Sequence, residues 1–244
     1  MIPIAGRGPY QFNAASWHRT KPCVETQHAA SLRRAPERLG LITLGRSFPL
    51  FPLHPSHCLR SNEPTNPNHH IFTKRLCLRL LKPSDAADIV RLLGNDSEAV
   101  QMLASISDPV TEAAALDWID RRTGTDQHVF AILLKSSGEF IGAIGFGGAK
   151  ELPYVGYWIG RLHWNQGYAT EAVMGLIDYA RWLGIPCLQA DTFPDNPASA
   201  RVLAKAGFAN KGRIQLNLPM RGGMRELEHH LINLSDNNSD NIQS

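Results

Sequence analysis

The most constraining feature of this chain is a strand-like run that passes through a glycine-containing turn directly into a long amphipathic helix. Val155, Tyr157 and Ile159 are separated by single residues that would point to the opposite face, which is the two-residue period of a strand. Gly167 and Ala169 keep side-chain bulk off the turn, so backbone N–H groups can point at one ligand with the positive end of the helix dipole behind them. The sequence therefore predicts an anion-binding turn. The helix after it has one buried face, formed by Ala169, Val173, Leu176, Ile177, Ala180 and Leu183.

A second strand and a second helix follow. Residues 188–192 predict a short strand, and residues 196–208 have the signals of a capped helix. Asn196 suits the N-cap, Pro197 suits the first helical position, and Gly207 suits the position just past the end. Two strand–helix units therefore stand in succession.

The rest of the region between residues 71 and 234 contains further periodic segments. Alternating leucines predict a first strand at 76–80, and Pro83 opens a helix that runs to about residue 93. Thr111 can cap a helix over 112–122. This order of elements predicts an α/β fold with a mixed sheet flanked by helices. Further strands are expected over 129–134 and 140–146 as a hairpin, over 152–159, and over 208–216 and 226–234 as a closing hairpin.

These segments together resemble a known family. The run 166–172, followed by 196–208, is similar to the acyl-CoA binding core of GNAT-type N-acetyltransferases. The segments 73–80 and 156–158 narrow the resemblance to the RimJ/RimL-like branch, and it covers roughly residues 71–234. It implies the GNAT-like acyl-CoA N-acyltransferase fold, in which the motif strand and the strand at 188–192 run parallel and then splay apart.

The resemblance also implies the cofactor site. Acetyl-CoA would be the co-substrate, with no metal, and its pantetheine arm would lie between the splayed strands. Asn196 would hydrogen-bond to that arm, and Ser199 would face the thioester sulfur. The family's phosphate turn usually begins with Gln or Arg, whereas this chain has Trp164, so we expect a backbone cradle. Backbone groups for the arm would come from Trp158, Ile159 and Gly160, and those for the diphosphate from Asn165, Gln166, Gly167, Tyr168, Ala169 and Thr170.

Acyl transfer to an amine needs a base for the ammonium, a donor for the oxyanion and a proton for the departing thiolate. The oxyanion donor is most simply a backbone N–H near Trp158 or Ile159. Many GNAT enzymes place a tyrosine after the second motif helix, and Phe208 stands there in this chain. Protonation of the leaving group could therefore fall to Ser199.

The identity of the base stays open at this point. Relatives often carry Glu two residues before the Gly-Tyr-Trp of the motif strand, and this chain has Tyr154 there. A tyrosine, with a pKa of ~10 in water, is not a ready base at neutral pH. Glu151 and Asp191 are the remaining local carboxylates, acting directly or through ordered water.

Two functions follow from these residues. The first is an acetyl-CoA-dependent N-acetyltransferase that transfers an acetyl group to a primary amine, either a protein N-terminus or a small-molecule amine, by direct attack in a ternary complex. Loops 103–109 and 216–223 would form the acceptor site, and the protein would be a monomer or a homodimer. The alternative is a non-catalytic acyl-CoA-binding sensor or interaction module, motivated by Tyr154 and Phe208 in place of the usual carboxylate and tyrosine.

Charge separates the chain into unequal parts. Residues 1–70 carry eight Lys/Arg and three Glu, a net charge of +5, whereas residues 71–244 carry 17 Lys/Arg and 19 Asp/Glu, a net charge of −2. The slightly acidic domain disfavours a nucleic-acid partner. Nine of the 16 prolines precede residue 71. We interpret 1–70 as a disordered or wrongly included segment, which also has the composition of an organelle transit peptide, 71–234 as the acetyltransferase domain and 235–244 as a polar tail.

The remaining composition excludes other classes of site. The four cysteines lack paired spacing, which favours free thiols in a reducing compartment and hence a cytoplasmic location. No run of 18 apolar residues is present, so we expect no membrane partner. One cluster of possible metal ligands lacks the spacing of a tetrahedral site: His54, His57, Cys58, His69 and His70.

Overall fold

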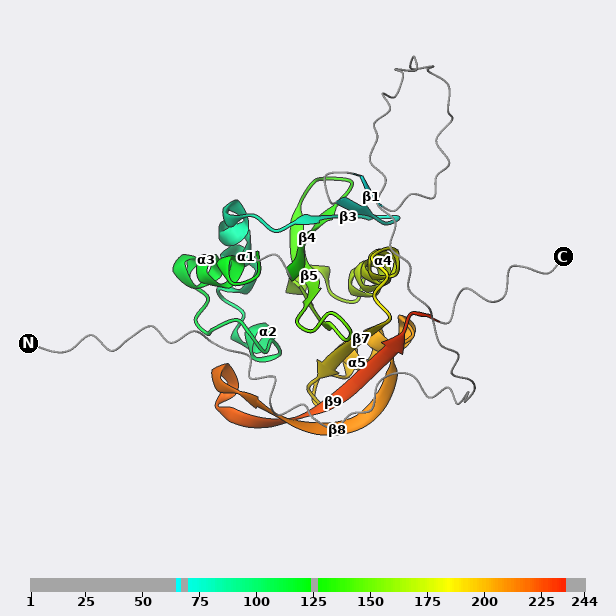
Figure 1. Ribbon diagram of the computed structural model, residues 1–244. Coiled ribbons are helices and arrows are strands. Elements are labelled where there is room, and N and C mark those ends of the chain that lie inside the picture. The colour runs from blue at the N-terminus through cyan, green and yellow to red at the C-terminus, as the bar shows by residue number, and fades with distance from the viewer. Residues whose placement is uncertain (1–64, 67–69, 124–126, 236–244) are drawn as a thin grey trace, which may run out of the picture. The chain divides into compact units, whose positions relative to one another are not determined.

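The computed structural model of the chain describes residues 65–66, 70–123 and 127–235 (Figure 1). All described residues belong to one compact unit. The predicted N-terminal segment up to residue 64 and the polar tail from residue 236 lie outside the described residues. Within the described ranges, no helix is long and apolar enough to cross a lipid bilayer.

The described strands form one mixed sheet, as predicted. Its order is β1-β2-β3-β4-β5-β6-β7-β9-β8. Every neighbouring pair is antiparallel except β6 and β7, which are parallel. The strands are β1 (Thr65–Asn66), β2 (His70–Phe72), β3 (Leu76–Leu80), β4 (Gln127–Leu134), β5 (Phe140–Gly147), β6 (Tyr154–Ile159), β7 (Cys187–Thr192), β8 (Ala209–Leu218) and β9 (Gly223–Asn233).

Helices cover both faces of this sheet. Successive side chains of a strand point to opposite faces, so a single strand packs against helices on both sides. On β4, Phe130 and Ile132 pack in a cluster with the buried face of α4, whereas Val129 and Ala131 pack with α1, α2 and α3. Figure 1 shows α1 to α3 grouped apart from α4. The helices are η2 (Pro83–Asp85), α1 (Ala86–Leu93), α2 (Ser97–Gln101), α3 (Glu112–Asp120), η3 (Arg161–His163), α4 (Tyr168–Trp182), α5 (Pro197–Lys205) and η4 (Pro219–Arg221).

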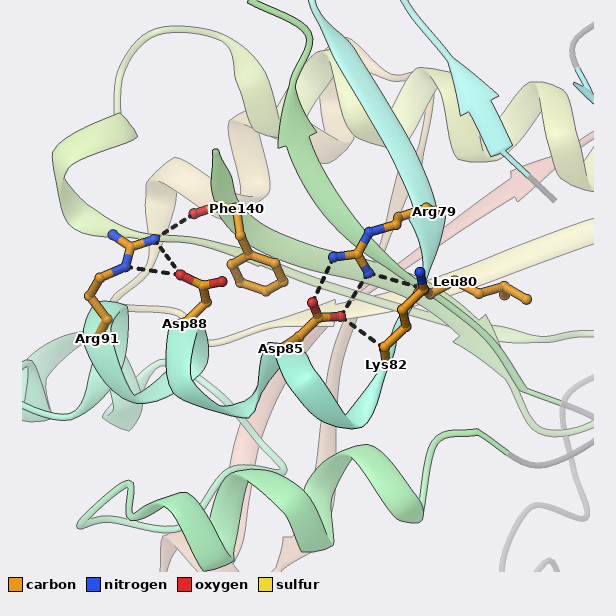
Figure 2. A network of polar contacts seen from close by, with 7 residues as sticks. All are labelled: Arg79, Leu80, Lys82, Asp85, Asp88, Arg91 and Phe140. Atoms are coloured by element: carbon orange, nitrogen blue, oxygen red, sulfur yellow. Dashed lines mark hydrogen bonds and ion pairs between the residues drawn. The ribbon is translucent and has the colours of Figure 1, made fainter. Parts of the chain in front are cut away.

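A network of ion pairs holds the start of α1 against the sheet (Figure 2). The guanidinium of Arg79 on β3 donates to both carboxylate oxygens of Asp85, at 2.6 and 2.8 Å. Asp85 is 3% exposed and also accepts from the backbone N–H of Lys82 at 2.8 Å. Arg91 pairs with Asp88 at 2.9 Å and donates to a β5 carbonyl. Only the first pair is buried, so it is the one that fixes α1.

The local signals read from the sequence are present. The side chain of Thr111 accepts from the N–H of Ala114 at the start of α3, and the side chain of Asn196 accepts from the N–H of Ser199 at the start of α5. The helix expected from Pro83 begins as a 3-10 turn before α1.

Other elements differ from the prediction. The helix α2 was not predicted, because its five residues are too few to show a period; the side chain of Asp96 caps it. The short strands β1 and β2 were also not predicted. The helix α3 ends at Asp120 rather than at 122, and β8 extends to Leu218.

The parallel strands β6 and β7 separate after a single pair. Tyr154 lies opposite Gln189, and the N–H of Gln189 donates to the carbonyl of Pro153 at 3.0 Å. Beyond this point no further β6–β7 pair forms in the described residues. Each strand keeps its other neighbour, β5 or β9. We call the unpaired edges of residues 155–159 and 190–192 the β6–β7 opening, and they supply the splay that the resemblance implied.

Candidate active site

The turn between β6 and α4 adopts a conformation that gathers backbone N–H groups. Asn165 has φ 58° and Gly167 has φ 80°, both left-handed. Asparagine tolerates this region better than most residues, and glycine does so without strain. Such turns form anion-binding concavities, and the first N–H groups of α4, which begins at Tyr168, have no partner within the helix. The predicted strand–turn–helix is therefore present, with Asn165 as a left-handed residue that the sequence analysis did not single out.

Trp164 anchors this turn. Its indole Nε1 donates to the carbonyl of Ile159, the last residue of β6, at 2.6 Å. The guanidinium of Arg161 lies 4.6 Å from the centre of the indole ring and pairs with Asp96 at 2.6 Å. The hydrogen bond from Arg161 lowers the pKa of Asp96. Trp164 thus ties the turn to the strand, and Arg161 ties the same turn to the start of α2.

A second anchor joins the turn to the segment before β3. The Oε1 atom of Glu171 accepts from the Thr73 hydroxyl and from the backbone N–H of Arg75, both at 2.6 Å. The Arg75 side chain donates to Oε2 of Glu171 at 2.7 Å and to the carbonyl of Gln166 at 2.9 Å. Burial alone would raise the pKa of Glu171, but the hydrogen bonds from Thr73 and Arg75 outweigh it and hold the pKa below its usual value.

The result is a fixed cation beside the turn. The guanidinium of Arg75 stacks 4.4 Å above the ring centre of Tyr168, and one of its nitrogens lies 3.4 Å from where a Cβ on Gly167 would stand. Sequence reasoning missed Arg75, since its partner Glu171 is 96 positions away. A cavity of about 520 Å³ opens beside the turn, lined by Gly167 and Thr170 and by two lysines, Lys74 and Lys205.

The edge of β6 presents fewer backbone groups to the opening than expected. The N–H of Gly160 donates to the carbonyl of Ile141 at 2.8 Å and is therefore occupied. Because backbone groups alternate sides along an antiparallel strand, those of Trp158 also face β5, while those of Tyr157 and Ile159 face the opening. Among the three residues expected to serve the pantetheine arm, Ile159 is thus the one whose N–H faces that way.

Ser199 lies beside the opening on the α4–α5 face. The hydroxyl of Tyr157 lies 2.8 Å from the Ser199 hydroxyl and 3.2 Å from the Ser199 carbonyl. Burial raises the pKa of Tyr157 to about 12, against a smaller opposing effect of the Ser199 hydrogen bond. The side-chain oxygen of Asn196 is held by the cap at 3.1 Å, which leaves its amide N–H₂ for another partner.

The structure separates the three candidate bases. Glu151 is exposed in the turn before β6, so it lies at the opposite end of β6 from the turn that leads into α4. Tyr154 stands at the last β6–β7 pair. Asp191 lies within the opening on β7, and its Oδ1 is 2.8 Å from Nδ1 of His229 on β9. Sequence reasoning missed His229, because only the β7–β9 register brings it opposite Asp191.

Other sequence expectations concern metals and thiols. Within the described residues, no group of three His, Cys, Asp or Glu is placed to hold a metal ion. His54, His57, Cys58 and His69 lie outside those residues. Cys77 and Cys187 form no disulfide within the described residues, and Cys23 lies outside the described residues together with Cys58.

Comparison with known proteins agrees with this geometry. The sequence model of the acetyltransferase (GNAT) domain family matches residues 75–209. "Uncharacterized N-acetyltransferase p20" of Bacillus licheniformis is 31% identical over 153 residues, which cover 59% of this chain and 85% of that protein.

Solved structures share the fold. The GNAT-family acetyltransferase from Bacillus anthracis superposes with a TM-score of 0.60 at 21% identity, over 68% of this chain and 98% of that one. Mycobacterium smegmatis RimJ, solved in complex with CoA-disulfide, superposes with a TM-score of 0.54 at 24% identity, over 65% of this chain and 81% of that one. The expected likeness to the RimJ/RimL-like branch is thus confirmed at the level of the fold. The chain belongs to the GNAT family of acetyltransferases.

Proposed function

We propose that this protein is an acetyl-CoA-dependent N-acetyltransferase that acts on a primary amine, a protein N-terminus or a small-molecule amine, by direct attack in a ternary complex. One observation carries the proposal: β6 and β7 separate after the Tyr154–Gln189 pair, directly before the turn in which Asn165 and Gly167 are left-handed. An extended thiol arm and a diphosphate are the ligand parts that such an opening and such a turn fit.

Several groups of the chain suit coenzyme A. The N–H groups of the turn and of the first turn of α4 would hold the diphosphate, and Arg75 would add a side-chain cation where the family's usual Gln or Arg is replaced by Trp164. Lys74 and Lys205 line the adjoining cavity together with Glu171 and Asp178, and the two lysines would supply the cations for a further phosphate. The side-chain amide of Asn196 would bind the pantetheine arm. A Cβ at Gly167 would stand 3.4 Å from a guanidinium nitrogen of Arg75, at a φ of 80° that L side chains rarely adopt.

Acetyl-CoA, when bound, supplies an acetyl group activated as a thioester. The N–H of Ile159, which faces the β6–β7 opening, would stabilise an oxyanion at the edge of β6. The Ser199 hydroxyl, joined to Tyr157, holds a proton for the leaving thiolate on the α4–α5 face. Acid and oxyanion donor thus come from two elements that border the same opening.

The amine would approach on the other face of the sheet. Gly156 is exposed on the side shared with Tyr154 and Trp158, and a Cβ built there meets no atom within 4 Å. This face is therefore open in the middle of β6, where a side chain would otherwise stand.

The two predicted acceptor loops are joined to one another by an arginine. Arg221 in η4 is 5% exposed and donates to the carbonyls of Val100 and Ile106, the latter at 2.8 Å. We infer that Arg221 holds the loops in a fixed relation and so shapes the acceptor pocket.

Thiol release from acetyl-CoA, measured with a panel of amines and short peptides, tests the proposal. Turnover with at least one primary amine is expected, together with saturable binding of coenzyme A. Tight binding without turnover of any acceptor would favour the acyl-CoA sensor instead, for which Tyr154 in the place of a carboxylate is the motivation. Absence of binding would contradict both functions.

A further inference from the structure

A carboxylate–imidazole pair lies on the sheet next to the β6–β7 opening. Asp191 and His229 face each other across the antiparallel β7–β9 ladder, with Oδ1 and Nδ1 2.8 Å apart. The side chain of Asp191 is 3% exposed and that of His229 is 10% exposed. The pair is thus largely buried, and the imidazole keeps a small exposed fraction.

Strand register places this pair on the face where the amine would approach. Tyr154 lies opposite Gln189, so Gln189 and, two residues later, Asp191 share the face of Tyr154 and Gly156. Asp191 is the first residue of that face beyond the last β6–β7 pair. The exposed Gly156 and the Asp191–His229 pair therefore border the same side of the opening.

The hydrogen bonding of the pair is incomplete. Nδ1 of His229 has Asp191 as its partner, and Nε2 has none among the described residues. Oδ2 of Asp191 is buried and also lacks a partner in the described part of the chain. Buried polar atoms are nearly always paired, so an unpartnered carboxylate oxygen beside an open strand edge indicates a group that binds there when the enzyme works.

The adjacent histidine shows what a purely structural imidazole looks like in this sheet. His230 is 3% exposed on the opposite face, and its Nε2 lies 3.1 Å from the hydroxyl of Thr192. Burial lowers the pKa of His230, which favours its neutral form. His230 has a neutral partner and His229 has a carboxylate, although the two residues are neighbours.

Charged groups on both flanking strands define the surroundings of His229. Asp191 lies on β7, and Glu228 is the residue before His229 on β9. On β8, which is bulged between Asn210 and Arg213, Arg213 pairs with Glu226 at 2.7 Å and Lys211 is exposed. Among these described groups, Asp191 is the one that contacts the ring of His229.

We propose that His229 is the general base that deprotonates the acceptor amine, and that Asp191 is the positioning residue that fixes its ring. This inference rests on the proposed function. The Asp191 carboxylate accepts a hydrogen bond from Nδ1–H, which sets the tautomer and leaves the lone pair of Nε2 to take a proton. The unpartnered Oδ2 would accept from the ammonium group or from water beside it.

The protons of the reaction balance in this scheme. The acceptor ammonium gives one proton to Nε2 of His229, and the imidazolium releases it to solvent. The free amine forms the C–N bond as the C–S bond breaks. The departing sulfur takes a proton from the Ser199 hydroxyl, and the second proton from the nitrogen, passed through solvent water, restores that hydroxyl, so the products are the amide, the free thiol and one proton in solvent. The base and the acid thus work on opposite faces of the sheet.

The substitution His229→Gln tests the proposal, with His230→Gln as the matched control. We expect kcat/KM to fall by about 10²- to 10⁴-fold in His229→Gln, the range of general base catalysis, with coenzyme A affinity unchanged within about twofold. In wild type, a protonated imidazole cannot act as the base, so kcat/KM should fall towards acidic pH. This fall should be absent in His229→Gln. Asp191→Asn should lower kcat by a smaller factor than His229→Gln does. His229→Gln activity equal to that of the control would overturn the proposal.

Two measurements do not depend on activity of the variants. The ring ¹⁵N shifts of His229 in the cofactor-free protein should report the Nδ1–H tautomer in wild type and its loss in Asp191→Asn; a tautomer with the proton on Nε2 in wild type would overturn the proposal. Carbethoxylation of His229 in the folded wild-type protein should abolish transfer while coenzyme A still binds. Full activity after that modification would also contradict it, whereas failure of wild-type protein to bind coenzyme A would contradict the proposed function itself.

Discussion

The hydroxyl of Tyr157 on β6 lies 2.8 Å from the hydroxyl of Ser199 on α5, so one hydrogen bond joins the edge of the opening to the helix beside it. The position after α5 where many relatives have a tyrosine is filled by the buried Phe208. In this chain a tyrosine hydroxyl reaches the same helix from the strand instead. Ser199 is thereby held by a buried partner that remains protonated at neutral pH, since burial raises the pKa of Tyr157 to about 12.

Removal of the Ser199 hydroxyl tests its role as acid. Ser199→Ala should lower kcat by about 10²-fold, since general acid catalysis is lost, while the KM for acetyl-CoA changes little. Tyr157→Phe should lower kcat by a smaller factor, because Ser199 loses its orientation but keeps its proton. Steady-state kinetics of both variants checks this. If the two variants keep wild-type kcat, the leaving group takes its proton from elsewhere.

Bulk and charge at the phosphate turn should block the cofactor. Gly167→Glu places a carboxylate where an anion binds, at a residue with φ 80°, so we expect saturable binding of coenzyme A to be lost. Gly184 offers a matched control: it has φ 71° and no atom within 4 Å of an added Cβ. Gly184→Glu should share the cost of backbone strain and keep the affinity. Calorimetric titration of both variants with coenzyme A measures this, and equal affinities would contradict diphosphate binding at the turn before α4.

Arg75 should contribute to cofactor affinity through its side chain. Arg75→Gln removes the cation beside the turn, and we expect the Kd for coenzyme A to rise about tenfold, the effect of one charge-assisted hydrogen bond. Arg213→Gln on β8, which breaks an exposed pair, serves as the control. A Kd for Arg75→Gln that matches the control would show that Arg75 is structural only.

The Glu171 anchor predicts a pH dependence of stability. The folded pKa of Glu171 is lowered, so the stabilisation is fully present above the ordinary glutamate pKa of ~4.3 and is lost as pH falls through the lower folded value. Glu171→Gln should therefore unfold at a lower temperature than wild type at neutral pH, and the gap should narrow as the pH drops below about 4. Thermal unfolding over a range of pH measures this. A gap that stays constant down to low pH would contradict the assignment.

The two carboxylates of Figure 2 should differ in their effect on stability. Asp85→Ala leaves Arg79 unpaired at a buried site and removes the acceptor for the N–H of Lys82, which should cost about 2–4 kcal/mol of unfolding free energy. Asp88→Ala breaks a pair whose side chains are 46% and 41% exposed, and it should cost less than about 0.5 kcal/mol. Denaturant unfolding of both variants compares them; equal losses would contradict this view of the network.

Local features of the fold could be read from the sequence, and distant contacts could not. The caps at Thr111 and Asn196 and the helix after Gly167 depend on neighbouring residues, so residue type and spacing predict them. The Arg75–Glu171 anchor joins residues 96 positions apart, and the Asp191–His229 pair joins residues 38 apart. Both depend on which strands are neighbours and in which register, and a single sequence contains no direct signal for either.

Two details of the site also could not be predicted from the sequence. Trp158 and Gly160 belong to the predicted strand, but antiparallel alternation turns their backbone groups towards β5 and leaves Ile159 on the opening. Trp164 was noted only as a departure from the family's usual Gln or Arg, with no role assigned to its side chain. The structure gives its indole a bond to the end of β6, which only the folded turn reveals.

The central claim is that the N–H groups after Trp164 surround a diphosphate while the β6–β7 opening admits a thiol arm. Titration of ¹⁵N-labelled protein with coenzyme A tests it residue by residue. The amide resonances of residues 165–170 and of Ile159 should shift together and saturate, and the same resonances in Gly167→Glu should stay in place. Saturable shifts confined to other parts of the sheet, or no shifts in a folded sample, would contradict the account.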